Sequence, residues 1–455
     1  MRDAERHRCA RHDRPPVLGI TAVLAVARDH DLVRFNPELL GEHEARRGAC
    51  NPPDGRDRAL LRWKDSVEAG LRRRQLPKIE PQNLDHRRRH PRRIGAEYSY
   101  ASARGTATAQ DCGMLIVASD EHRSHHPRQP FLDRGRLIDP PEVPERVDRI
   151  LHAIAGAGLG PVVEPVAFPS DALLRVHSEE YVEFLETAHA RWREATGLGE
   201  DSEAVAYARA IRGQPYVESL HVIGELGWYS HDSDPLLAGT WSAARAAVDV
   251  TLTAWQADAD GREPSAYACT RPPGHHAAAE SFAGYCYLNN AAVAAQAWVD
   301  LGARVAIIDV DYHHGNGTQQ IFYDRDDVFF VSLHADPAFE YPFLLGFASE
   351  RGWGGGEDCT RNFPLPSGTT WDTYGPACDA ALDLVRRFAP DAVVVSLGVD
   401  TALEDRDTFR LVGDDYSRIG EGVRALSLPT LVVQEGGYCL DVIGRNVVRV
   451  LAALA

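Results

Sequence analysis

Two carboxylates and an imidazole follow predicted strands in a pattern that suits a divalent metal. Asp309, Asp311 and His313 come at the end of the apolar run Val305–Val310, where alternation along a strand places the three side chains on one side. Asp400 follows a second apolar run in the same way. Carboxylate and imidazole ligands without thiolate suit Zn²⁺, with Fe²⁺ or Co²⁺ as alternatives, and three protein ligands leave one coordination position open for catalysis. An Asp-x-His pair by itself is more often a turn at a strand end.

Two further segments carry groups that could act beside such a metal. The turn Arg271–His276 ends in adjacent histidines. Near an activated water, His275 and His276 could supply a base and an electrostatic partner, although such a pair can also be an ordinary polar turn. Glu435–Tyr438 follows another apolar run, and its two glycines permit a tight turn that could direct the Tyr438 hydroxyl into a cleft.

The elements that must position these groups alternate between short apolar runs and longer amphipathic segments. This alternation predicts an α/β fold with a parallel sheet covered by helices on both faces, and ligands in such sheets bind beyond the carboxyl ends of the strands. The predicted strands are Val305–Val310, Val328–Leu333, Ala392–Leu397 and Thr430–Gln434. The predicted helices are Trp241–Ala257, Asn290–Val299, Trp371–Phe388, Tyr416–Ala425 and Val442–Leu454.

The chain changes in composition near Met114. Residues 1–113 carry 21 Arg and 2 Lys against 16 Asp and Glu, whereas residues 114–455 carry 26 Arg against 50 Asp and Glu. We expect 1–113 to be a disordered Arg-rich extension or a spurious upstream translation, and 114–455 to be the catalytic domain, because Met114 directly precedes a strand-like run.

The overall composition excludes several classes of protein. No apolar stretch approaches the roughly 18 residues of a spanning helix, so no membrane association is expected. The net charge of −17 argues against a nucleic-acid partner and leaves room for a cationic substrate. The eight cysteines lie far apart without a CxxC pair, so reduced thiols in a cytoplasmic protein are expected.

Taken together, the motifs resemble those of the histone deacetylase superfamily, and most of all those of bacterial acetylpolyamine amidohydrolases. The resemblance implies a three-layer α/β/α, arginase-like fold with a mostly parallel central sheet, and it extends over roughly residues 114–455. The motif Pro140–Val147 resembles the segment that leads into the first helix of that family. The other motifs, which occur in the order of the family, are Arg271–His276, Gly284–Asn290, Asp309–Thr318, Ser396–Asp400 and Glu435–Tyr438.

The resemblance also implies a role for each matching residue. Asp311, His313 and Asp400 would bind zinc, and Tyr438 would donate a hydrogen bond to the oxyanion. The remaining assignments are His275 oriented by Asp309, His276 oriented by Asn316 and closer to the leaving nitrogen, Asp309 and Ser332 around a structural K⁺, Gly284 and Tyr285 along the acyl tunnel, and Phe343 or Leu344 on the wall opposite.

The expected reaction is zinc-dependent removal of acetyl groups from acetylated polyamines or similar small amines. The segment 190–239 matches an insertion that narrows the entrance and contributes to a homodimer in the related enzymes. Its acids Glu218, Glu225, Asp232 and Asp234 could meet a distal ammonium, although each could also be a solvated loop residue. Deacetylation of acetyl-lysine in proteins or peptides is the alternative, and a catalytically silent binder of acetylated ligands is a remote one.

Overall fold

The structure is a computed structural model that describes residues 113–209, 221–261, 265–406 and 409–455. Our predictions for the Arg-rich extension and for Glu218 therefore fall outside the described residues and stay predictions. Among the helices described, none combines the length and the apolar character needed to span a bilayer.

In the described residues, eight parallel strands form one sheet in the order β4-β1-β5-β10-β9-β6-β7-β8. The four predicted strands are present. Strands β4, β5 and β8 were not predicted, because their apolar runs are short or interrupted by polar residues. A separate antiparallel hairpin joins β2 and β3. The strands are β1 (Leu115–Val117), β2 (Phe131–Asp133), β3 (Arg136–Ile138), β4 (Val162–Val163), β5 (Ser265–Ala268), β6 (Val305–Asp309), β7 (Val328–Ala335), β8 (Thr360–Leu365), β9 (Ala392–Leu397) and β10 (Thr430–Gln434).

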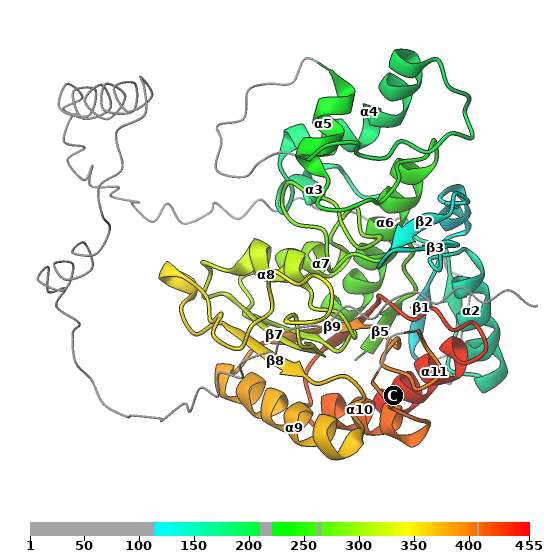
Figure 1. The fold of residues 1–455 in the computed structure, drawn as a ribbon. Helices are drawn as coiled ribbons and strands as arrows, with labels where there is room; N and C mark the ends of the chain where they lie inside the picture. Colours follow the sequence, from blue (N-terminus) through cyan, green and yellow to red (C-terminus); the bar gives the residue numbers. More distant parts are fainter. Residues whose placement is uncertain (1–112, 210–220, 262–264, 407–408) are drawn as a thin grey trace, which may run out of the picture. The chain divides into compact units, whose positions relative to one another are not determined.

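Alternating residues of each central strand face two different hydrophobic cores. Val305 and Ile307 of β6 belong to one core, while Ala306 and Ile308 belong to the other. Burial on both faces explains why these strands are continuous apolar runs rather than alternating ones. The cores separate the helices into two layers, so the predicted three-layer α/β/α fold is confirmed (Figure 1).

Helices α3 to α7 pack on one core, and α2, α9, α10 and α11 pack on the other. All five predicted helices are present with end shifts of at most two residues. The largest shift at a helix start is in α10, which begins two residues before the predicted Tyr416. Its first turn contains Asp414 and Asp415, and negative charge is favourable at the N-terminus of a helix. The helices are α2 (Glu145–Ala157), α3 (Asp171–Leu174), α4 (Glu179–Thr196), α5 (Val222–Tyr229), α6 (Thr240–Ala259), α7 (Asn290–Asp300), α8 (Asn316–Phe322), α9 (Trp371–Phe388), α10 (Asp414–Arg424) and α11 (Ile443–Leu454).

Candidate active site

The predicted metal ligands lie together at the carboxyl ends of β6 and β9, which are neighbours in the sheet. Asp311, His313 and Asp400 each offer a ligand atom within 4.8 Å of the other two. Nδ1 of His313 lies 3.5 Å from Oδ1 of Asp311 and 3.2 Å from Oδ2 of Asp400. The register that pairs Asp309 of β6 with Ser396 of β9 brings these loops to one point.

The electrostatics of this cluster fit a divalent cation. Asp311 and Asp400 are almost completely buried, with side-chain exposures of 1% and 3%. Burial and the charge of Asp311 raise the pKa of Asp400 to about 7, although His313 acts in the opposite direction. Two buried carboxylates this close repel each other, and a cation between them would relieve that repulsion. The donor set of two carboxylates and one imidazole nitrogen matches zinc or a similar metal.

Backbone donors hold the two carboxylates in place. The Gly436 N–H donates to Oδ2 of Asp311 at 2.8 Å, and the Tyr312 N–H donates to Oδ1 of Asp400 at 3.0 Å. A Cβ at position 436 would lie 2.5 Å from Oδ2 of Asp311 and 2.7 Å from Oδ2 of Asp400, so only glycine allows the Glu435–Tyr438 turn to come this close.

Tyr438 reaches the same pocket as His276, His313 and Asp400. Its backbone N–H donates to Oδ2 of Asp405 at 2.7 Å, and the guanidinium of Arg146 lies 4.8 Å from the centre of its ring. Burial raises the pKa of Tyr438 well above its ordinary value, although Arg146 lowers it. The phenol therefore keeps its proton and can donate it in a hydrogen bond.

The two adjacent histidines have different partners, as expected. Nδ1 of His275 donates to Oδ2 of Asp309 at 3.0 Å, and Nδ1 of His276 donates to Oδ1 of Asn316 at 2.7 Å. Burial opposes protonation of His275, but the carboxylates of Asp311 and Asp309 outweigh it and raise its pKa to about 10. Burial, followed by the positive charges of neighbouring histidines, lowers the pKa of His276 well below its ordinary value.

A buried ionic network supports the floor of the site, and sequence reasoning missed it. Oε1 of Glu142 accepts hydrogen bonds from Arg146 and Arg271, both at 2.8 Å. Arg146 also donates to the backbone oxygens of Glu435 and Gly437, so it holds the turn that carries Tyr438. The signal was available, because Glu142, Arg146 and Arg271 all belong to motifs that matched the family.

The pocket above the cluster has a volume of about 530 Å³. Gly284 and Tyr285 line it as predicted, and the wall opposite is formed by Tyr341, whose ring packs edge-on against His276 with ring centres 5.0 Å apart. Phe343 and Leu344, which were predicted for this wall, are not among the residues that line the pocket. Their side chains are 48% and 70% exposed, so the assignment of these two residues to the substrate pocket stays a prediction.

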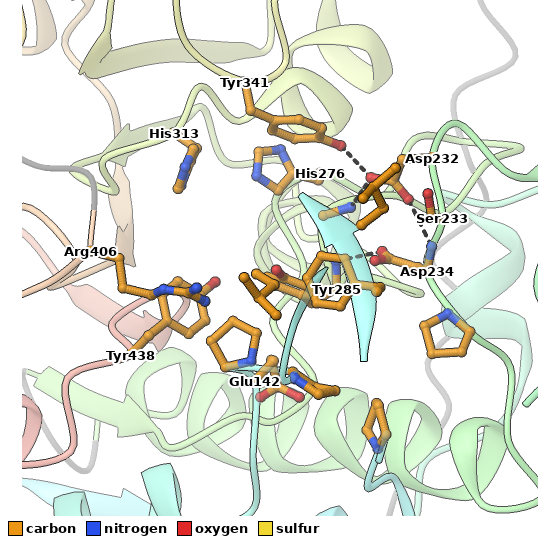
Figure 2. A pocket seen from close by; sticks show the side chains of 18 of the residues that line it. Glu142, Asp232, Ser233, Asp234, His276, Tyr285, His313, Tyr341, Arg406 and Tyr438 are labelled. Atoms are coloured by element: carbon orange, nitrogen blue, oxygen red, sulfur yellow. Dashed lines mark hydrogen bonds between the residues drawn. The ribbon is translucent and has the colours of Figure 1, made fainter. Parts of the chain in front are cut away.

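The described part of the 190–239 segment supplies part of the pocket wall, but Glu225 is not part of that wall. Glu225, on α5, does not line the pocket, because it forms an ion pair with Arg191 of α4. Asp232 and Asp234 do line it (Figure 2). Oδ2 of Asp232 accepts the Gly284 N–H at 2.8 Å and the Tyr341 hydroxyl at 2.7 Å, so it joins the two tunnel walls.

The predicted potassium residues lie side by side on neighbouring strands. Asp309 of β6 pairs in register with Ser332 of β7, and both are fully buried. The Ser332 hydroxyl shares a 2.7 Å hydrogen bond with Nδ1 of His334. The assignment of K⁺ to these residues stays a prediction.

Comparison with known proteins identifies the family. Residues 140–454 match the model of the histone deacetylase domain. The chain is 48% identical over 341 residues to acetylpolyamine amidohydrolase 1 of Pseudomonas aeruginosa, which covers 74% of this chain and 98% of that protein. It is 41% identical over 345 residues to the acetylpolyamine amidohydrolase of Mycoplana ramosa, covering 75% and 100%.

A solved structure gives the same result. The acetylpolyamine aminohydrolase of Burkholderia pseudomallei superimposes with a TM-score of 0.70 at 39% identity, over 75% of this chain and 98% of that one. Both the predicted family and the predicted class of enzyme, a hydrolytic deacetylase, are confirmed. From its fold, its motifs and these relatives, the chain belongs to the histone deacetylase family.

Proposed function

We propose that this enzyme removes acetyl groups from small acetylated amines, including acetylated polyamines, with a divalent metal held by Asp311, His313 and Asp400. The observation that carries the proposal is the convergence of these ligands with His276 and Tyr438 at the bottom of one pocket. The names of the relatives from P. aeruginosa and M. ramosa support acetylpolyamines as substrates.

Zinc is the metal proposed for this site. When bound, such a cation supplies Lewis-acid polarisation of an amide carbonyl and activation of a water molecule. The residues around it then have to remove a proton from water, stabilise negative charge on the carbonyl oxygen, and return a proton to the departing amine.

His276 is suited to the proton transfers. Because the amide oxygen of Asn316 accepts the proton on Nδ1, the neutral ring presents an unprotonated Nε2. His275 is suited to electrostatic support instead, since its hydrogen bond to the Asp309 carboxylate favours the protonated ring. The two rings lie 4.0 Å apart, so proton positions on one affect the other.

Tyr438 is suited to stabilise the oxyanion. Arg146 and Asp405 hold the backbone of its turn, so the position of the Tyr438 ring is fixed by the protein itself. A pre-oriented donor stabilises developing charge without a reorganisation cost, which is why loss of one such donor typically lowers the rate about 100- to 1000-fold.

The structural K⁺ at Asp309 and Ser332 and the homodimer are also part of the proposal. Both are supported by the family resemblance alone. Sedimentation of the full chain and potassium analysis of the purified protein test them directly.

The decisive experiment compares metal-depleted enzyme with zinc-reloaded enzyme on a panel of acetylated amines. We expect acetylputrescine and acetylspermidine to be hydrolysed only after reloading, with one zinc retained per chain after dialysis. A preference for acetyl-lysine peptides over every small amine would instead favour the protein deacetylase alternative. Zinc retention without hydrolysis of any acetylated compound would contradict the proposed function.

A further inference from the structure

The outer part of the pocket contains two arginines that differ in their partners. Arg134, at the turn of the β2–β3 hairpin, forms an ion pair with the buried Glu340. Arg406, which follows Asp400 in the chain, is exposed, and no ion pair to its guanidinium is found in the described ranges. Within the described part of the chain, the hydrogen bond found for Arg406 is that of its backbone N–H, which donates to Oδ1 of Asp405 at 2.8 Å.

The opposite side of the pocket is acidic. Figure 2 shows Arg406 on the side of Tyr438, and Asp232 and Asp234 across the pocket from it. Glu203 also lines the pocket, and its carboxylate accepts the N–H of Gln129 at 3.0 Å. Backbone N–H groups donate to all three carboxylates, and the Tyr341 hydroxyl also donates to Asp232. Among the described residues, none of the three forms an ion pair with an arginine.

Arg406 on one side and the carboxylates of Asp232 and Glu203 on the other therefore offer opposite charges, whereas burial and the neighbouring Asp232 raise the pKa of Asp234 well above its ordinary value. A guanidinium without a partner binds a carboxylate strongly, because its planar donors match the two carboxylate oxygens. A substrate with positive charge only would satisfy the acidic side but would place its ammonium groups near Arg406. A substrate whose free end carries both an ammonium and a carboxylate would satisfy both sides.

We propose that the outer pocket selects a diamino acid acetylated on its side-chain nitrogen, such as Nε-acetyllysine or Nδ-acetylornithine. The α-carboxylate faces Arg406, the α-ammonium faces Asp232 and Glu203, and the acetamide reaches Tyr438. The chemistry is that of the proposed function, on which this inference rests: water adds to the carbonyl, the C–N bond breaks, the amine takes a proton, and acetate and the free diamino acid leave.

The test is a comparison of kcat/KM for three substrates with the zinc-loaded full chain. Free Nε-acetyllysine carries both charges, a derivative with blocked α-amino and α-carboxyl groups carries neither, and N-acetylputrescine carries only the ammonium. We expect the wild type to prefer free Nε-acetyllysine to both of the others. Arg406→Gln should lower kcat/KM for it about tenfold, mainly through KM, and raise that for N-acetylputrescine.

Matched variants separate a specific effect of Arg406 from a general one. Arg410→Gln removes an exposed arginine of the same loop that does not line the pocket, and it should change no ratio. Arg406→Lys should keep part of the preference because it keeps the charge. The inference is overturned if Arg406→Gln changes kcat/KM for all three substrates equally or for none. Absence of hydrolysis of every acetylated amine by the wild type would instead remove the proposed function itself.

Discussion

The residues at the floor of the pocket and those at its entrance differ in how firmly the fold holds them. On the floor, Asp311, Asp400 and His276 follow directly from strands or a buried turn, and the backbone or a fixed side chain holds each of them. At the entrance, Arg406 and Glu203 lie on loops, the β2–β3 hairpin lies outside the main sheet, and all three are at least partly exposed. The sheet thus positions the candidate catalytic groups, whereas the entrance, where we propose that substrates are selected, is built mainly outside the sheet.

The strongest test of the rigid floor is Tyr438→Phe. We expect kcat to fall about 100- to 1000-fold, because the oxyanion loses its oriented donor, while zinc stays bound, because the hydroxyl is not a ligand. Kinetics and metal analysis of the same preparation measure both. Tyr207→Phe, at a side chain that is 93% exposed, is the control and should behave as wild type. Near wild-type turnover in the Tyr438 variant would reject its role.

A second test measures how much a buried carboxylate without a hydrogen-bond partner lowers the stability of the protein. Asp258 of α6 is buried and, among the described residues, neither carboxylate oxygen has a hydrogen-bond partner. Burial raises its pKa from 3.8 to about 7. Because the folded state binds the proton more tightly, this group favours folding below pH 3.8, and the contribution is lost as the pH rises through 7.

Asp258→Asn should therefore stabilise the protein at pH 8, by at most about 4 kcal/mol for a shift of about three pKa units, and have little effect at pH 4. Denaturant unfolding at the two pH values measures the difference. Asp260→Asn, at the adjacent C-terminal end of the helix, provides a comparison. Equal stability of the Asp258 variant and the wild type at pH 8 would show that the carboxylate is not desolvated.

A third test concerns the link between the two regions. Asp405 lines the pocket, and its Oδ2 accepts the N–H groups of Tyr438 and Cys439 at 2.7 and 2.9 Å. Asp405→Ala should lower kcat about tenfold by loosening the Tyr438 turn, with less change in KM. Asp405→Asn keeps an acceptor oxygen and should restore most of the rate. If Asp405→Ala raised KM without lowering kcat, or if Asp405→Asn restored no activity, Asp405 would act in substrate binding rather than in positioning Tyr438.

The smallest effect is expected at Glu225. Because this carboxylate is paired with Arg191 away from the pocket, Glu225→Gln should change kcat/KM less than about twofold for every acetylated amine. Asp232→Asn is the contrasting variant, since it weakens the link between Gly284 and Tyr341 and should raise KM for cationic substrates several-fold. Equal effects of the two substitutions would break the distinction between these acids.

The success of sequence prediction follows the same division. Central strands were predictable because burial on both faces gives uninterrupted apolar runs, and the metal cluster followed because strand ends converge at one edge. The entrance was less predictable: Phe343 and Leu344 are close to Tyr341 in sequence, but the direction of an exposed loop depends on tertiary contacts. In the sequence, Glu225 and Asp232 were equally good candidates for the acidic side of the pocket. The packing of α5 against α4 shows that Glu225 pairs with Arg191 instead.

The same carboxylate that steadies the tyrosine turn is joined through the chain to the arginine at the entrance, since Asp405 and Arg406 are consecutive. A change of the Arg406 side chain alone should act on substrate preference, whereas a change that shifts the backbone here would also move Asp405 and slow the chemical step. An insertion or deletion in this loop would therefore alter substrate range and turnover together, although a single side-chain replacement at Arg406 would not.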